Sequence, residues 1–151
     1  MEIRELAEHI LFGTTLEEKL VSSGRLVDTS PGRAHTTPDA PGRPAELALD
    51  RWSESQRVPF GDVRALERDE DRGLVLHFFA NHELLAAELM ALVLLKFPDA
   101  PERFRRGVAQ TMKDEQEHVR LYLDRMKDAG VTFGQIPVSD FFWRAIAPMP
   151  S

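Results

Sequence analysis

The longest run without proline or glycine, from Leu74 to Phe97, constrains the fold of this chain most. Nearly every side chain in the run is apolar or favours helices, so it predicts one helix of about 24 residues, roughly 36 Å long. Apolar side chains lie almost all the way round it, as in a buried or membrane-spanning helix. Because Glu83 and Glu88 interrupt the run and its longest charge-free piece is too short to cross a bilayer, we expect a bundle core and no membrane partner.

A second long helix is expected after the break Pro98-Asp99-Ala100-Pro101. Proline suits the first turn of a helix, where its missing N–H has no partner to lose. Gly130 suits the left-handed position that often ends a helix. The pattern therefore predicts a helix from about Pro101 to Ala129, and the two long helices form an antiparallel hairpin.

The N-terminal part is predicted to hold only short helices and a long loop. Apolar residues at helical spacing predict a helix over Glu2 to Phe12 that stops at Gly13, and Thr15 can cap a short second turn. Four prolines and three glycines between Ser22 and Pro44 predict an extended loop.

The segments that flank the hairpin are predicted to pack against it. In the ambiguous stretch Ala45 to Leu66, Pro59-Phe60-Gly61 predicts a turn and Trp52 an anchor for the loop. The tail contains a short apolar turn at Phe141-Phe142-Trp143. We therefore divide the chain into an N-terminal segment (1–70), the hairpin with its ligand motif (71–130) and a C-terminal tail (131–151).

Composition excludes several classes of function. The net charge of -6, from 25 acidic and 19 basic residues, argues against a nucleic acid partner, which clustered Lys and Arg would bind. The absence of cysteine removes thiol nucleophiles and Cys-based metal sites, so His, Asp or Glu must hold any metal. The N-terminus is acidic where a signal peptide is basic, and we expect a cytoplasmic protein.

Carboxylates occupy apolar stripes in both long helices. Glu115 fills a gap in the apolar stripe of the second helix, and His118 lies one turn further on the same face. Glu83 stands at the centre of a stripe in the first helix. Glu83 and Glu115 are each 16 residues from Asp99, about 24 Å along the helices, so we expect them to face each other.

A Glu on one helix and a Glu-x-x-His on its neighbour make half of a di-iron carboxylate ligand set. Carboxylates bridge two cations and neutralise their charge, and an imidazole adds a nitrogen ligand that suits iron. The residues alone leave another interpretation open. Glu83 and Glu115 could pair with His118 or a nearby Arg, or one of them could point to solvent.

Two stretches of the sequence resemble a known kind of protein. The run Asn81-His82-Glu83-Leu84-Leu85-Ala86, followed by Glu115-Gln116-Glu117-His118, resembles the first half of a ferritin-like di-iron bundle. Most of the chain is similar to an uncharacterised bacterial family of ferritin-like proteins, in the stretches Ile3 to Leu16, Pro41 to Pro44, His77 to Leu89, the Glu115 helix and Phe133 to Trp143. The resemblance implies an all-α, ferritin-like hairpin with Glu83, Glu115 and His118 as metal ligands.

Two further histidines, His77 and His82, also match the family pattern. For His82, which lies about 100° round the helix from Glu83, we favour a hydrogen-bonded position at the edge of the core. Family members are longer and carry a second hairpin with another Glu and Glu-x-x-His. The resemblance therefore implies either a truncated product or a homodimer whose two chains complete a four-helix bundle.

Two functional hypotheses follow. The first is an oxidoreductase with a di-iron centre between two chains, which reacts with dioxygen or peroxide to oxidise a small molecule or ferrous iron; manganese could replace iron. Tyr122 would then lie near the metals, either as a redox-active group or as a core aromatic. The second is a non-catalytic helical module whose apolar face binds another copy or another protein. The carboxylates favour the first hypothesis and the missing hairpin the second.

Overall fold

The computed structural model describes residues 1–51 and 66–151. Within them the regular structure is helical, apart from one isolated bridge between Glu2 and Val27, so the expected all-α fold is confirmed. Trp52 and the turn predicted at Pro59-Phe60-Gly61 lie outside the described residues.

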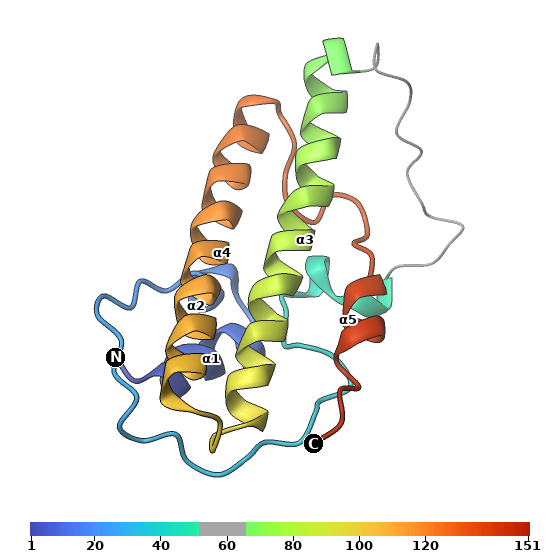
Figure 1. Cartoon of the computed structure of the whole chain (residues 1–151). Helices are drawn as coiled ribbons and strands as arrows, with labels where there is room; N and C mark the ends of the chain where they lie inside the picture. Colours follow the sequence, from blue (N-terminus) through green and yellow to red (C-terminus); the bar gives the residue numbers. More distant parts are fainter. Residues whose placement is uncertain (52–65) are drawn as a thin grey trace.

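Two long antiparallel helices, α3 (Asp69–Lys96) and α4 (Glu102–Asp128), form the predicted hairpin (Figure 1). The helix α3 begins five residues before the expected Leu74, because three acidic residues in its first turn, Asp69, Glu70 and Asp71, favour the positive end of the helix dipole. The helix α4 ends as expected, with Gly130 at a φ of 74°.

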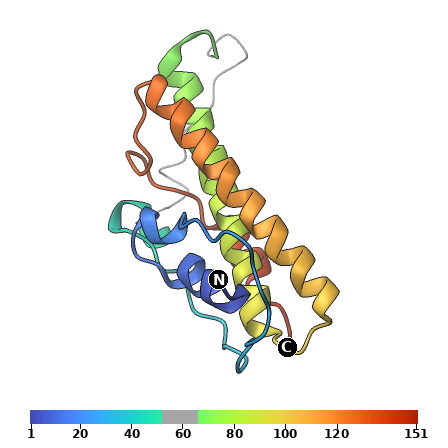
Figure 2. The ribbon, with the colours of Figure 1, turned by 90° about the vertical axis from the view of Figure 1, so that its left-hand side faces the viewer.

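The short helices α1 (Ile3–Phe12) and α2 (Leu16–Lys19) lie on one broad face of this hairpin, beside the half nearest its turn (Figure 2). The apolar side of α1 packs against α3, and the Oγ1 atom of Thr15 caps α2 by accepting the Glu18 N–H at 3.1 Å. Together they build a core whose fully buried apolar side chains include Ile3, Leu6, Ile10, Leu11, Leu47, Leu84, Leu92, Leu94, Leu95 and Met112.

Side chains of α4 hold the predicted extended loop on the same side of the hairpin. The guanidinium of Arg105, 2% exposed, makes two hydrogen bonds to the Asp28 carboxylate, at 2.8 and 3.0 Å. Just before the loop, the side-chain amide of Gln116 donates to the carbonyl of Lys19, the last residue of α2, at 2.9 Å. The loop is therefore ordered by buried polar contacts rather than by regular structure.

Shorter elements complete the fold beside α3. The 3₁₀ helices η1 (Ala45–Leu47) and η2 (Leu49–Arg51) follow the loop, and the tail ends in α5 (Phe141–Ile146). The indole N–H of Trp143 donates to the carbonyl of Asp39 at 2.8 Å and so anchors the loop.

By length and composition α3 could cross a membrane, with a mean hydropathy of 1.6 in its most apolar stretch. In this structure 61% of that stretch is buried by the rest of the chain, as in the core helix of a bundle.

The second broad face of the hairpin is not covered by any segment that the structure describes (Figures 1 and 2). We call it the open face. Helical periodicity places on it Phe79, Glu83, Ala86 and Met90 of α3 and Phe104, Gly107, Val108, Thr111, Glu115, His118 and Tyr122 of α4. Large apolar side chains remain accessible there, with Phe79 43% and Phe104 51% exposed.

Candidate metal centre

Glu83 of α3 and Glu115 and His118 of α4 meet on the open face. One donor atom from each of the three lies within 4.8 Å of the others. The Nδ1 atom of His118 is 3.2 Å from a Glu115 carboxylate oxygen and 3.9 Å from one of Glu83. The structure therefore brings together all three residues that the sequence predicts as ligands.

Helix geometry explains how the three side chains converge. Glu115 and His118 are three residues apart and share one face of α4, while the hairpin turn brings Glu83 to the same height. The expectation that both carboxylates fill core positions is wrong for the single chain. Their side chains are 23% and 15% exposed, because α1 and the loop pack against the other side of the hairpin.

The surroundings of Glu83 change its ionisation. Burial, together with the hydrogen bond and negative charge of Glu115, raises the pKa of Glu83 to about 7, while the charge of His118 opposes the shift. Two carboxylates this close favour a bound proton or a cation between them.

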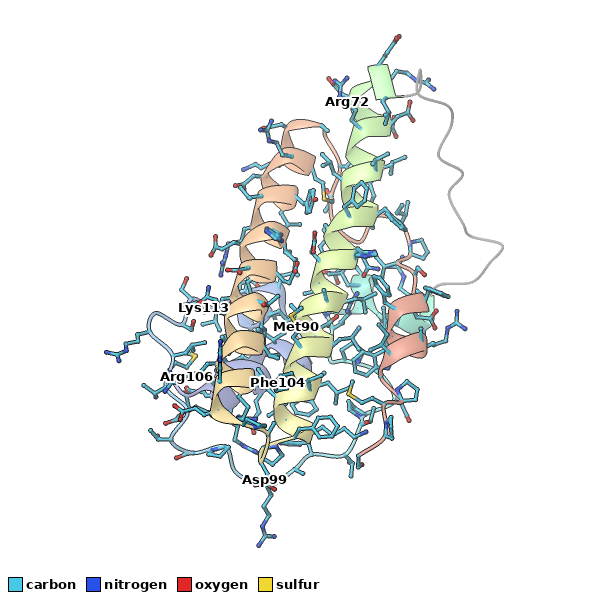
Figure 3. The ribbon with its side chains drawn as sticks, viewed as in Figure 1. Arg72, Met90, Asp99, Phe104, Arg106 and Lys113 are labelled. Atoms are coloured by element: carbon cyan, nitrogen blue, oxygen red, sulfur yellow. The ribbon has the colours of Figure 1, made fainter. Side chains whose placement is uncertain are left out.

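Aromatic and apolar side chains surround the cluster along the open face. One turn towards the N-terminal end of α3, Phe79 stacks on Tyr122 with ring centroids 6.1 Å apart. Towards the hairpin turn, a groove of about 590 Å³ lies between the helices. Figure 3 labels Met90 of α3 and Phe104 of α4, which border this groove, and Gly107, Val108 and Thr111 also line it.

The other two candidate histidines do not join the cluster. His77 is 1% exposed, and its Nε2 atom accepts the Gly134 N–H at 2.9 Å. The ring of His82 packs edge-on against Phe142 at 4.1 Å, and burial lowers its pKa. We expected a hydrogen-bonded His82 at the edge of the core. The contact described for its ring is with the aromatic ring of Phe142.

Sequence reasoning missed a second polar cluster, around Glu88. This carboxylate is fully buried and accepts from Lys19 Nζ at 2.8 Å and from Arg43 Nε and Nη2 at 3.0 and 2.5 Å. Arg43 also donates to Asn81 Oδ1 at 2.8 Å. One signal could have found the cluster, because Arg43 and Glu88 both lie in stretches that carry the family resemblance.

Fold and cluster together define the class, an all-helical protein with two carboxylates and an imidazole converging on a helical hairpin. The chain belongs to the family described as protein of unknown function (DUF455), whose sequence profile matches residues 4–150. No curated protein and no solved structure is significantly similar to it.

Proposed function

We propose that this chain contributes half of a di-iron carboxylate centre and that the complete protein is a ferritin-like oxidoreductase. One observation carries the proposal. The donor atoms of Glu83, Glu115 and His118 converge within 4.8 Å on the open face.

The donor set fits a divalent transition metal. Carboxylate oxygens and one imidazole nitrogen suit iron, and manganese accepts the same ligands. A cation would replace the proton that the pKa of about 7 leaves on Glu83, and it would offset the repulsion between Glu83 and Glu115. When bound, the metal would supply redox chemistry with dioxygen or peroxide.

The residues around the donors have roles of their own in this proposal. Phe79 and Tyr122 stack beside the cluster and exclude water from one side. A drier site strengthens the attraction between the carboxylates and a cation. The substrate would be a small molecule or ferrous iron, and the fold alone does not choose between them.

Three donors do not complete a di-iron site, which uses a Glu and a Glu-x-x-His from each of two hairpins. A second copy of the chain would supply the same three residues again. We propose that the centre is shared between two chains.

Metal analysis of two matched variants tests the proposal. The full chain, made in iron-replete cells without a metal-affinity tag, should carry about one iron per chain by plasma mass spectrometry. Glu115→Ala should lose the metal. Glu117→Ala should keep it, because Glu117 faces solvent on the same helix and pairs with Arg120. Loaded protein should consume oxygen when ferrous iron or a reductant is added.

Two results would contradict the proposal. A metal-free native chain, or unchanged metal content in Glu115→Ala, would favour the non-catalytic helical module.

A further inference from the structure

We propose that the open face binds a second copy of this chain about a twofold axis that runs across the helices beside the metal cluster. In this arrangement the Phe79–Tyr122 pair of each copy fills the groove at Gly107 of the other. The inference rests on the proposed function, since it names the partner that completes that site.

The position of the cluster along the hairpin is the first argument. Glu83 is 14 residues from the start of α3 and 13 from its end, and Glu115 is 13 residues from each end of α4. A twofold axis across the helices at this height brings the two clusters together. It also overlaps both hairpins along their whole length, whereas an axis at any other height loses contact at the ends.

The second argument is the shape of the open face, on which the aromatic pair and the groove lie on opposite sides of the cluster. Tyr122 is seven residues from Glu115 on one side, and Val108 of the groove is seven residues away on the other, about 10 Å in each case. The proposed axis exchanges these two sides, so each aromatic pair meets a groove. An axis parallel to the helices would set aromatic pair against aromatic pair and leave both grooves empty.

Gly107 supplies an independent argument. A Cβ atom built on it would meet no atom within 4 Å, so the packing of this chain does not require a glycine there. Glycine inside a helix is less favourable than alanine, because it loses more conformational freedom on folding. A missing side chain beside the groove leaves room for an aromatic ring of the partner.

The size and charge of the open face suit a stable dimer. Two helices of 28 and 27 residues make a face about 40 Å long and about 18 Å wide, or about 700 Å² per copy. Stable interfaces bury about 800 Å² per partner. From the aromatic pair to Val108, the only ionisable groups that periodicity places on this face besides Tyr122 are the three metal donors. Arg103 lines the groove at its end nearest the hairpin turn.

Engineered cysteines test the arrangement, since the native chain has none. In Val108→Cys/Tyr122→Cys the two thiols are about 21 Å apart along one helix, so a disulfide can form only between chains. We expect mild oxidation of this variant to give a covalent dimer.

Two controls measure cross-linking that does not depend on the proposed arrangement. Tyr122→Cys alone should not cross-link, because the two copies of position 122 also lie about 21 Å apart across the axis. Gln110→Cys/Asp124→Cys has the same spacing on exposed positions outside the open face and should stay monomeric on a denaturing gel. Equal cross-linking of either control, or no cross-linking of Val108→Cys/Tyr122→Cys, would overturn the arrangement.

A second variant tests the interface without cysteines. Gly107→Glu should keep its helical circular dichroism, because space is open at that position, but its solution mass should fall from dimer to monomer. Gln110→Glu, one turn away, should remain a dimer. A monomeric native chain, or a dimeric Gly107→Glu, contradicts the proposal.

Metal content measured on the same samples separates this inference from the proposed function. A metal-free dimer that passes the cysteine test supports the interface and contradicts the function. A metal-loaded monomer contradicts the interface alone.

Discussion

At the residue scale, His77 shows how the core restricts a single ionisable side chain. The ring is buried against Phe133, and its Nε2 atom must be unprotonated to accept the Gly134 N–H. Burial lowers the pKa of His77 to about 4. The folded chain therefore holds this histidine neutral at pH values where the unfolded chain protonates it.

This difference predicts an acid-sensitive stability. Between about pH 6.5 and the folded pKa of about 4, His77 is protonated in the unfolded chain but not in the folded one. The free energy of unfolding therefore decreases as the pH is lowered from about 6.5 to about 4, and it levels off at lower pH. The loss should reach about 3 kcal/mol. In His77→Gln, which accepts a hydrogen bond but does not titrate, urea unfolding at pH 7 and 4.5 should show a smaller difference. The control His9→Gln should show the same difference between pH 7 and 4.5 as the native chain. If His77→Gln also showed the native difference, the acid sensitivity would not come from His77.

At the element scale, α3 meets the tail through a glycine rather than a side chain. Gly73 is buried, and a Cβ atom there would lie 2.4 Å from the Cγ2 atom of Val131. This close approach holds the tail residues after α4 against the first turns of α3. A residue that weakens the isolated helix is therefore needed for the packing of the hairpin.

Gly73→Ala should destabilise the protein by about 1–3 kcal/mol, although alanine favours helices, because the methyl group overpacks the contact with Val131. Val131→Ala removes the Cγ2 atom, which is the closest one, and should recover part of that loss in the double variant. A double-mutant cycle from chemical denaturation measures this coupling, and additive losses would show that the two residues do not interact.

At the scale of the whole molecule, the Glu88 cluster joins five separate parts of the chain, namely α1, α2, the loop, α3 and the tail. Lys19 at the end of α2 also donates to the Ile10 carbonyl at 2.6 Å, and Asn81 of α3 donates to the Ser139 carbonyl of the tail at 3.1 Å. Arg43 brings in the loop. Two cations thus share one buried carboxylate, and burial lowers the pKa of Lys19 against the opposing charge of Glu88.

This charge balance predicts unequal effects of two substitutions. Glu88→Gln leaves two buried cations without an anion and should cost about 3–5 kcal/mol of unfolding free energy. Lys19→Met should cost less, because Arg43 and Glu88 remain as a balanced pair with two hydrogen bonds. Urea denaturation checks both, with the exposed Glu70→Gln as control. Equal losses for Glu88→Gln and Lys19→Met would show that charge balance does not govern the cluster.

Local sequence signals predicted the elements and the height of the cluster. Proline and glycine positions placed the hairpin turn and the end of α4, and Thr15 capped α2 as expected. Spacing from the turn brought Glu83 level with Glu115 and His118, because helical rise is nearly constant.

Only the tertiary structure decided which face of α3 is covered. This helix is apolar almost all round, so its periodicity selects no buried side, and the prediction that Glu83 and Glu115 fill the core was wrong. For the same reason the sequence, which selected Glu83 by its height, did not indicate that Glu88 is fully buried in a polar cluster. Glu83 lies on the open face beside His118. Glu88 is buried, and Lys19 and Arg43, which are distant in the chain, pair with it in the folded protein. Local spacing determines where a side chain lies along a helix, while the packing of distant segments determines what surrounds it.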